Sequence, residues 1–334
     1  MQKQLDQLHL TTTDVGTLPL EDDFEGERKN FDRAVLDKVR VGLDYPCCPQ
    51  LPGSRPKPMN MGLQFLIPLS RHCSAIEISG EDAELLSDEI EIPPMPIGAE
   101  RAEYFVNYLR EQELLSGVRG LKVCVTGPFT LASYLNRKNL MTCGASKAQV
   151  VRSLAYVLGR TCERLNSLGF DLISIDEPFL SVMLGRKVMF NYDDRFVVEV
   201  LDLVVSRISG FSAVHVCGMV TPLVKKVLLE CGVNVLDHEF SGTPTNLHAY
   251  SREDLEQHEK FLAYGCVSSV KTQVETIDEI SKSIRDAINL FGPRIIVKPD
   301  CGFGGMLGIR DAYGFVLKKL ENMVKAARLV SESR

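Results

Sequence analysis

The feature that most constrains this chain is a regular alternation of short apolar runs with longer amphipathic segments. Each apolar run has the length and composition of a buried strand, and a helical pattern separates most neighbouring runs. Strands that alternate with helices form a parallel sheet, because parallel neighbours need a long crossover connection. A β-rich segment at 10–15 and a short strand at 42–45 precede the apolar runs, which lie at 121–125, 171–175, 213–216, 233–236, 262–267 and 295–297.

Eight such units in 334 residues favour an α/β fold of the closed (βα)8 (TIM) barrel type over an open doubly wound sheet. No linker or internal repeat divides the chain, so residues 1–334 are predicted to form a single barrel domain. An irregular, acidic insertion that includes residues 76–96 is expected between strands 2 and 3. Helices are expected at 31–41, 100–116, 147–168, 194–208, 222–229, 255–260, 278–291 and 311–330.

Composition narrows the class of partner. The chain has 44 acidic and 38 basic residues, a net charge of −6 that does not recruit nucleic acid or anionic membranes. No apolar run is long enough for a membrane span, and the first residues lack an apolar signal core. We therefore expect a cytoplasmic protein with no nucleic-acid or membrane partner, in which most of the 10 Cys residues are reduced and buried.

A histidine and a cysteine stand two residues apart at the end of the fifth run. In an extended chain His215 and Cys217 point to the same face, so that an imidazole nitrogen and a thiolate converge as zinc binding requires. Functional residues of a barrel lie at the C-terminal ends of its strands. Glu239 and Cys301 follow two further runs at that edge. These four residues are predicted to form a tetrahedral zinc site.

Each candidate also has a structural interpretation. A His-x-Cys pair is more often structural, an isolated Cys301 is more often a buried thiol, and Glu239 is more often a surface charge. His238 is the second choice as a ligand, because alternation turns it to the other face. Asp176 can equally be a helix-capping carboxylate. The glycine-rich segment 302–305 is a weak candidate for phosphate binding and lacks the dinucleotide-binding spacing.

Together these motifs resemble the C-terminal catalytic barrel of cobalamin-independent methionine synthase, particularly its short archaeal "core" type. The shared motifs cover most of the chain and keep the family's order and gaps. Zinc methyltransferases of the uroporphyrinogen-decarboxylase-like group also have His-x-Cys-Gly, but the Pro-Asp-Cys-Gly ending favours methionine synthase. The motifs are Thr11–Thr17, Gly42–Asp44, Thr126–Thr130, Ile175–Pro178, His215–Gly218, Glu239, Val274–Thr276 and Pro299–Gly302.

The resemblance implies a zinc-dependent S-methyltransferase of methionine biosynthesis, which methylates the thiolate of homocysteine at the four-ligand site named above. It implies that Gly16, Thr17 and Asp176 hold the amino-acid part of homocysteine. It also implies that Glu239 is the ligand that loosens when the thiol arrives. These roles are physically consistent, because zinc turns a bound thiol into the nucleophilic thiolate. A charged Asp176 would pair with an α-ammonium group.

Departures from the family pattern concern the substrates. Gln50 stands where the family has a glutamate near the substrate amine. A family histidine is missing near Val270 and Lys271, and no other general acid is evident. The chain has no Trp to stack on folate, and Tyr134 is the nearest candidate. The predicted methyl donor is therefore a methylcorrinoid, either methylcobalamin or a corrinoid protein, whose leaving group needs no amine protonation.

Three other functions remain open. The acceptor can be a different small thiol such as coenzyme M, whose sulfonate would require a basic pocket. The protein can instead be a non-catalytic accessory subunit that binds a corrinoid protein. A decarboxylase of the related barrel group is the weakest alternative, because that reaction does not need the zinc ligands.

Overall fold

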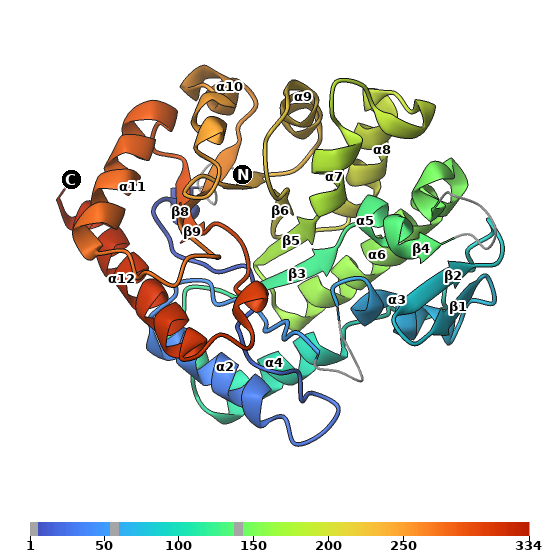
Figure 1. Cartoon of the computed structure of the whole chain (residues 1–334), viewed down its shortest axis with the longest axis horizontal. Helices are drawn as coiled ribbons and strands as arrows, with labels where there is room; N and C mark the ends of the chain where they lie inside the picture. The colour runs from blue at the N-terminus through green and yellow to red at the C-terminus, as the bar shows by residue number, and fades with distance from the viewer. Residues whose placement is uncertain (1–5, 54–59, 137–142, 334) are drawn as a thin grey trace.

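The computed structural model describes residues 6–53, 60–136 and 143–333. Its centre is a six-stranded parallel sheet in the order β3-β5-β6-β7-β8-β9, which curves around a common interior (Figure 1). These strands match the six later predicted strands to within three residues at each end. The strands are β3 (Lys122–Thr126), β5 (Leu172–Asp176), β6 (Phe211–His215), β7 (Val235–Glu239), β8 (Phe261–Val267) and β9 (Ile295–Pro299).

The first two predicted strands occur only as isolated parallel bridges. These bridges connect β9 to β3 through residues 12–13 and 45–47, in the order that a (βα)8 barrel requires. The barrel prediction is confirmed, but the regular ladder is not closed, and the expectation of full strands at 10–15 and 42–45 is wrong. The bridges are Thr12 to Val297, Thr13 to Tyr45 and Cys47 to Lys122.

Carboxylates take the place of ladder hydrogen bonds in this part of the barrel. Asp44 accepts hydrogen bonds from the backbone N–H and hydroxyl of Thr12, at 2.8 and 2.9 Å. Asp14 accepts from the backbone N–H groups of Cys47 and Gly16, at 2.8 and 3.0 Å. A side chain that satisfies a backbone donor removes the need for a neighbouring strand at that position. This is why short, apolar segments here do not become regular strands.

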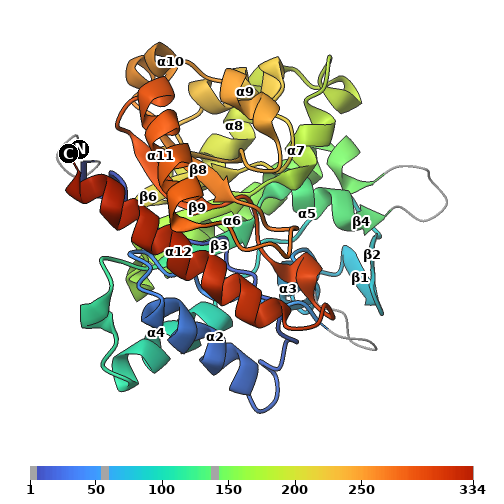
Figure 2. The same ribbon diagram turned by 60° about the vertical axis from the view of Figure 1, so that its left-hand side comes forward.

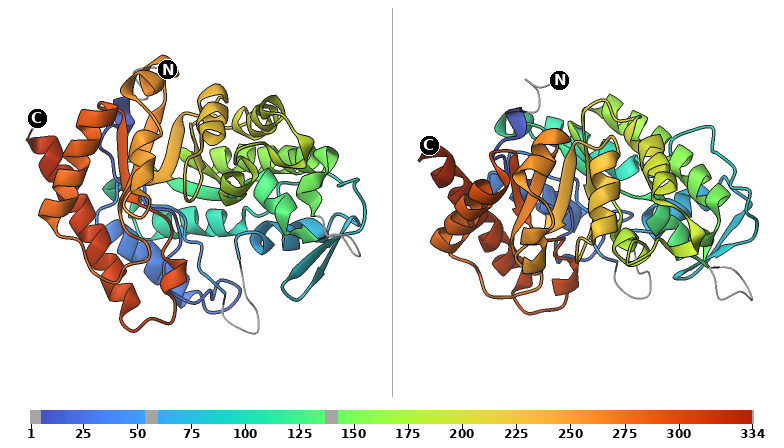
Figure 3. Two further views of the ribbon diagram at one scale, coloured as in Figure 1. Left: turned by 45° about the horizontal axis from the view of Figure 1, so that its top comes forward. Right: turned by 90° about the horizontal axis from the view of Figure 1, so that it is seen from above.

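The insertion before β3 is more ordered than predicted. Its acidic part forms an antiparallel hairpin, and the second strand of that hairpin pairs in parallel with β4 to make a separate three-stranded sheet. Figure 3 shows the hairpin projecting from the body of the molecule in both views. The expectation of an irregular insertion therefore holds for residues 86–96, which form no helix or strand, and is wrong for the hairpin at 76–85. Its elements are α3 (Leu63–Ser70), β1 (Ile76–Ser79), β2 (Asp82–Leu85), α4 (Glu100–Glu111), η2 (Leu115–Gly117) and, after β3, β4 (Leu135–Asn136).

Helices lie around the outside of the sheet, with α11 and α12 side by side in Figures 1 and 2. Within the described residues, no helix is long and apolar enough to cross a membrane. The short helices α5 and α7 were not predicted; each begins with proline at its first position, which suits a helix start directly after a strand. The helices are α2 (Lys29–Arg40), α5 (Pro128–Tyr134), α6 (Ala148–Leu168), α7 (Pro178–Met183), α8 (Asp194–Val205), α9 (Pro222–Glu230), α10 (Arg252–Gln257), α11 (Ile277–Phe291) and α12 (Ala312–Glu332).

Side chains that point into the barrel change character from one end to the other. The lowest layer, at the N-terminal ends of the strands, is apolar and includes Ala213, Val235 and Ile296. Inward-facing side chains recur every second residue along a strand. The next inward positions on the same strands are therefore His215, Asp237 and Lys298, all of them buried and polar. The interior thus presents charged groups directly below the C-terminal edge.

Candidate metal centre

Three predicted ligands converge at the C-terminal end of the barrel. The ligand atoms of His215, Cys217 and Cys301 all lie within 4.8 Å of one another. His215 Nε2 is 3.1 Å from Cys217 Sγ and 3.6 Å from Cys301 Sγ, and the two sulfur atoms are 3.7 Å apart. One imidazole nitrogen and two thiol sulfurs are a donor set that zinc prefers. The residues present therefore fit a zinc ion.

The local sequence explains this convergence. His215 is the last residue of β6, and Cys217 follows two positions later on the same side of the chain. Gly218 then adopts a φ of 77°, a conformation that other residues rarely take, so the chain can turn away directly after the ligand. Cys301 comes from the loop after β9, where the backbone N–H of Asp300 bonds Val267.

The second nitrogen of His215 is fixed by a carboxylate. Asp237, which is buried on the neighbouring strand β7, lies 2.6 Å from His215 Nδ1. Burial disfavours the charged imidazolium, but Asp237 outweighs that effect and raises the pKa of His215 to about 10. A metal binds the neutral imidazole, so zinc binding must release the second proton. A carboxylate on the other nitrogen is the usual way in which metal-binding histidines are oriented.

The two thiols do not have equal acidity. The hydrogen bond from Cys217 lowers the pKa of Cys301, burial opposes this change, and His215 reinforces it. The same sharing of a proton raises the pKa of Cys217. The thiolate is the form that binds metals, and the contact with His215 favours it at Cys301.

The fourth predicted ligand, Glu239, lies beside this group but is not one of its three members. It is the last residue of β7 and faces the interior two positions after Asp237. Its carboxylate accepts a hydrogen bond from Thr243 Oγ1 at 3.2 Å, and its charge adds to the rise in the pKa of Cys217. The structure thus brings together three of the four predicted ligands, with the fourth carboxylate at the edge of the cluster.

The competing ligand, His238, points to the opposite face, as alternation predicts. Its Nδ1 is 3.2 Å from the carbonyl oxygen of Val216, and its Nε2 is 3.0 Å from the hydroxyl of Tyr250. Burial lowers the pKa of His238 to about 4, so this imidazole is neutral at pH 7. Both nitrogens are already engaged by neighbours, which explains why it is not a ligand.

Asp176 reaches the same interior from β5. It is paired in register with His215 and is buried, and its Oδ1 accepts a hydrogen bond from Ser174 at 2.9 Å. Burial raises its pKa, and the charges of His215 and Lys122 oppose that rise. The helix-capping interpretation of Asp176 is wrong, because the residue before α7 is Glu177 and that helix has no side-chain cap.

Sequence reasoning placed Glu177 at the end of the same strand without a role of its own, and the structure shows that its role differs from that of Asp176. Its carboxylate accepts hydrogen bonds from the backbone N–H groups of Phe129 and Thr130 at 2.9 and 2.8 Å, and from the Thr130 hydroxyl at 2.6 Å. Burial raises its pKa to about 7. The side chain therefore fixes the start of α5, the helix after β3, to the end of β5. The sequence does not reveal this role, because Glu177 directly follows Asp176 and its backbone partners lie far away in the chain.

Of the predicted substrate residues Gly16, Thr17 and Gln50, Thr17 lies against the cysteine-bearing loop. Thr17 O accepts a hydrogen bond from the backbone of Phe303 at 2.9 Å, and a Cβ atom on Gly302 would lie 2.8 Å from Thr17 Cβ. The glycine of this loop is thus required for close packing on Thr17. Gly16 O accepts from the Gln50 backbone N–H at 3.3 Å, and the Gln50 side-chain amide donates to a backbone carbonyl of β3.

The last predicted substrate residue, Tyr134, ends α5 and packs against Gly62 of the insertion. Its side chain is half-buried, and burial raises its pKa. Val270, at the position of the missing histidine, is strongly exposed in the loop after β8. The structure therefore places the exposed Val270 and Lys271, and no histidine, in this loop.

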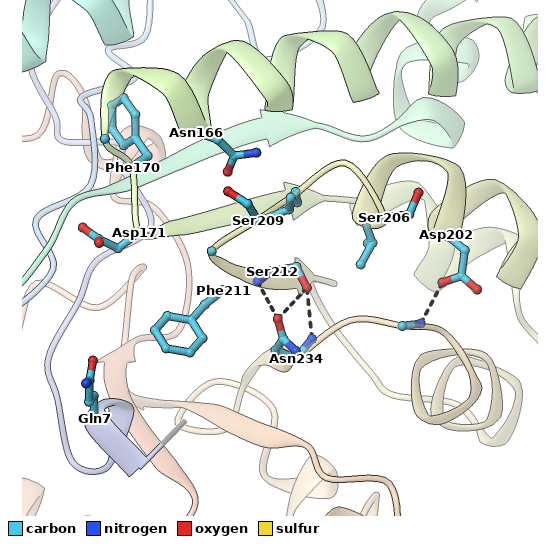
Figure 4. Close-up of a pocket in the computed structure, with 15 residues that line it drawn as sticks. Gln7, Asn166, Phe170, Asp171, Asp202, Ser206, Ser209, Phe211, Ser212 and Asn234 are labelled. Carbon is cyan, nitrogen blue, oxygen red and sulfur yellow. Dashed lines mark hydrogen bonds between the residues drawn. The ribbon is translucent and has the colours of Figure 1, made fainter. Parts of the chain in front are cut away.

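A cavity of about 760 Å³ lies at the other end of the barrel, below the first residues of β5, β6 and β7 (Figure 4). Several of its polar side chains already bond the surrounding backbone. The side chain of Asn234 accepts hydrogen bonds from the backbone N–H and the hydroxyl of Ser212. The carboxylate of Asp202 accepts one from the backbone N–H of Gly232, and that of Asp171 accepts one from the backbone N–H of Leu121, the residue before β3. The two ends of the barrel thus differ. Among the residues that the structure describes, side chains able to hold a metal ion converge only at the C-terminal end.

Comparisons with known proteins identify the family of the chain. The profile of a family described as "Cobalamin-independent synthase, Catalytic domain" matches residues 96–329. A methionine synthase from Methanothermobacter thermautotrophicus is 29% identical over 312 residues, covering 91% of this chain and 90% of the relative. One from Methanocaldococcus jannaschii is 30% identical over 220 residues, covering 63% of this chain and 65% of the relative.

Solved structures support the fold. A B12-independent methionine synthase from Shewanella sp. W3-18-1, in complex with selenomethionine, superposes with a TM-score of 0.72 at 16% identity, covering 97% of this chain and 98% of that chain. A methyltransferase from Methanosarcina mazei gives a TM-score of 0.61 at 15% identity, covering 90% and 85%. At such low identity these similarities show a shared fold alone.

Proposed function

This chain belongs to the cobalamin-independent methionine synthase family and is a methyltransferase, and from that premise we propose that it methylates the thiolate of homocysteine at a zinc ion, giving methionine. The observation that carries the proposal is the convergence of His215, Cys217 and Cys301 within 4.8 Å at the C-terminal edge of the barrel. Active sites of this fold lie at that edge.

In this proposal zinc is held by the three converging residues and by Glu239 as the fourth ligand. Bound zinc supplies one chemical effect: it lowers the pKa of a coordinated thiol, so that the nucleophilic thiolate forms at neutral pH. Glu239 keeps a single 3.2 Å hydrogen bond to Thr243, which leaves most of its acceptor capacity unused. A weakly held carboxylate at the edge of the cluster suits a ligand that gives way when the substrate thiol enters.

Asp176 is proposed to bind the α-ammonium group of homocysteine. Its carboxylate lies beside His215 in the interior and has one hydrogen bond from Ser174, so acceptor positions remain for a cationic partner. An ammonium group beside Asp176 would offset the effect of burial on its pKa. Thr17, which lies against the cysteine-bearing loop, and the preceding Gly16 are proposed to hold the rest of the amino-acid part.

A substitution tests this role of Asp176. Asp176→Asn keeps the size of the side chain and removes its charge, and it should lower kcat/KM for homocysteine by about 100-fold, equivalent to about 2.7 kcal/mol. Most of the change should appear in KM, while the zinc content stays at the wild-type level. Unchanged kinetics in a zinc-loaded variant would contradict the assignment.

We further propose that the methyl donor is a methylcorrinoid, either methylcobalamin or a corrinoid protein. Two observations support this donor over a folate. The chain has no Trp that could stack on a folate. The loop after β8 has the exposed Val270, and no histidine, where a folate donor would need a proton donor. Protonation assists the departure of a folate amine, whereas a corrinoid leaves without it. Efficient turnover with methyltetrahydrofolate and none with methylcobalamin would overturn this part of the proposal.

The choice of acceptor is testable in the same assay. Coenzyme M carries a sulfonate, whereas the polar groups closest to the cluster include the carboxylates of Asp176 and Glu239, which repel an anion. Homocysteine should therefore be the better acceptor. Gln50→Glu adds a negative charge near the proposed amine site and should increase the preference for homocysteine further. An inactive protein that still binds a corrinoid protein would instead favour an accessory role.

A further inference from the structure

A buried layer of charge lies directly beneath the three converging ligands. Asp237 is its centre and is flanked by the ammonium groups of Lys298 and Lys122, and each of these three residues is at most 1% exposed. Lys298 Nζ is 2.8 Å from Asp237 Oδ1, the same oxygen that contacts His215 Nδ1. Lys122 Nζ is 3.5 Å from Asp237 Oδ2, an oxygen with no closer hydrogen-bond partner.

Lys298 also contacts the backbone that leads to a second ligand. Its Nζ donates to the carbonyl oxygens of Pro299 and Asp300, at 2.9 and 2.7 Å, and Cys301 is the next residue. One buried ammonium group is thus bonded both to the partner of His215 and to the segment that carries Cys301. Lys122 is anchored separately, by donating to the carbonyl oxygen of Asp14 at 2.9 Å.

Asp300 continues this connection to the third ligand-bearing loop. Its carboxylate accepts hydrogen bonds from the backbone N–H groups of Phe240, Ser241 and Gly242 at 2.9, 2.9 and 2.7 Å, directly after Glu239. The segment held by Lys298 therefore helps to fix the position of the loop after β7 as well as that of Cys301.

Stability alone does not account for the two lysines. A buried ion pair costs desolvation energy, and apolar replacements of similar volume are often neutral or stabilising. The two lysines do offset the negative charge of the proposed zinc site. Two thiolates, Glu239, Asp237 and Asp176 bring five negative charges, of which a divalent metal and the two ammonium groups balance four, and the ammonium group proposed to bind Asp176 would balance the fifth.

We propose that Lys298 is a positioning residue of the metal centre, which acts on His215 through Asp237 and on Cys301 through the backbone of residues 299–300, with Lys122 as the second counter-charge. This inference rests on the proposed zinc site but not on the identity of the acceptor or donor. Asp237 holds the imidazole so that Nε2 faces the two sulfurs, and Lys298 holds both Asp237 and the adjoining loop in place.

The test compares two buried lysines in the full chain. Lys298→Met should weaken zinc binding by about 10- to 100-fold, the range found when outer-shell partners of metal ligands are removed. Lys260→Met is the matched control, because Lys260 is also buried but donates to the carbonyls of Cys231 and Val233 at the other end of β7. It should leave zinc affinity unchanged. Zinc affinity is measured by competition with a chelator.

A spectroscopic measurement separates positioning from general destabilisation. The Co2+-substituted protein should show shifted visible absorption bands in Lys298→Met and wild-type bands in Lys260→Met. Should Lys298→Met fail to fold, Asp237→Asn serves as the second variant, since it keeps the shape of the side chain while losing the charge that orients His215. A similar loss of zinc affinity is expected there. Wild-type zinc affinity and Co2+ bands in a folded Lys298→Met or Asp237→Asn protein would overturn the proposal.

Discussion

The two faces of the sheet at β6 and β7 each hold one buried histidine, and only one of the two has the surroundings of a metal ligand. His215 faces the barrel interior, with Asp237 on one nitrogen and two sulfurs near the other. His238 faces the surrounding helices, where Val216 and Tyr250 occupy both of its nitrogens. Both residues are buried and lie near the C-terminal edge of the barrel. The difference lies in whether one nitrogen faces other metal-binding atoms.

The electrostatics of the two faces differ in the same sense. A carboxylate raises the pKa of His215 to about 10 despite burial, whereas burial lowers the pKa of His238 to about 4. The interior face therefore stabilises the protonated, charged form of its histidine, and the helix-facing side disfavours that form. This comparison gives three predictions.

The largest expected effect separates the two histidines directly. His215→Gln should remove the bound zinc and lower the rate of methyl transfer by about 1000-fold or more, equivalent to at least about 4 kcal/mol. His238→Gln should keep the zinc and most of the activity. Metal analysis and kcat/KM on the two purified variants make the comparison. Loss of zinc from His238→Gln with retention in His215→Gln would reverse the assignment.

A second, smaller effect concerns acid stability. The unfolded chain protonates histidine near pH 6.5, but folded His238 resists protonation until about pH 4. Its contribution is therefore fully present above pH 6.5 and is lost as the pH falls to about 4, by up to about 3 kcal/mol. Urea unfolding at pH 7 and pH 4.5 should show a steeper acid loss in the wild type than in His238→Gln. Equal slopes in the two proteins would contradict this account.

The smallest effect is expected from the partner of His238. Tyr250→Phe removes the hydroxyl that lies 3.0 Å from His238 Nε2 and should lower the free energy of unfolding by about 1 kcal/mol. Zinc content and methyl transfer should not change, because this contact lies on the helix-facing side of the sheet. A Tyr250→Phe protein that is stable but loses its zinc would show that the two faces are coupled.

The sequence predicts the regular part of the barrel well, because each of the six later strands is a compact apolar run. The spacing of His215 and Cys217 also predicts their convergence, since alternation in an extended chain fixes it. The first two segments were predicted to be full strands but form only isolated bridges. Their backbone donors are satisfied by Asp14 and Asp44, and such long-range contacts leave no periodic pattern in the sequence.

The charged interior layer could not be predicted for a similar reason. Lysine within a strand usually indicates a solvent-exposed position, so Lys122 and Lys298 carry no sign of their burial. Only the curvature of the sheet, which places β3, β7 and β9 around one interior, brings their ammonium groups to Asp237. Glu177 is a parallel case, because the backbone that it binds lies nearly fifty residues away.

The metal content of the purified protein tests the central claim most directly. Wild type and Cys301→Ser are prepared without added metal, and zinc is measured per chain. The account predicts about one zinc per wild-type chain and loss or strong weakening of binding in Cys301→Ser, because the substitution removes one of three converging ligands. A folded wild-type protein that contains no zinc, and takes up none when it is supplied, would contradict the proposed metal centre.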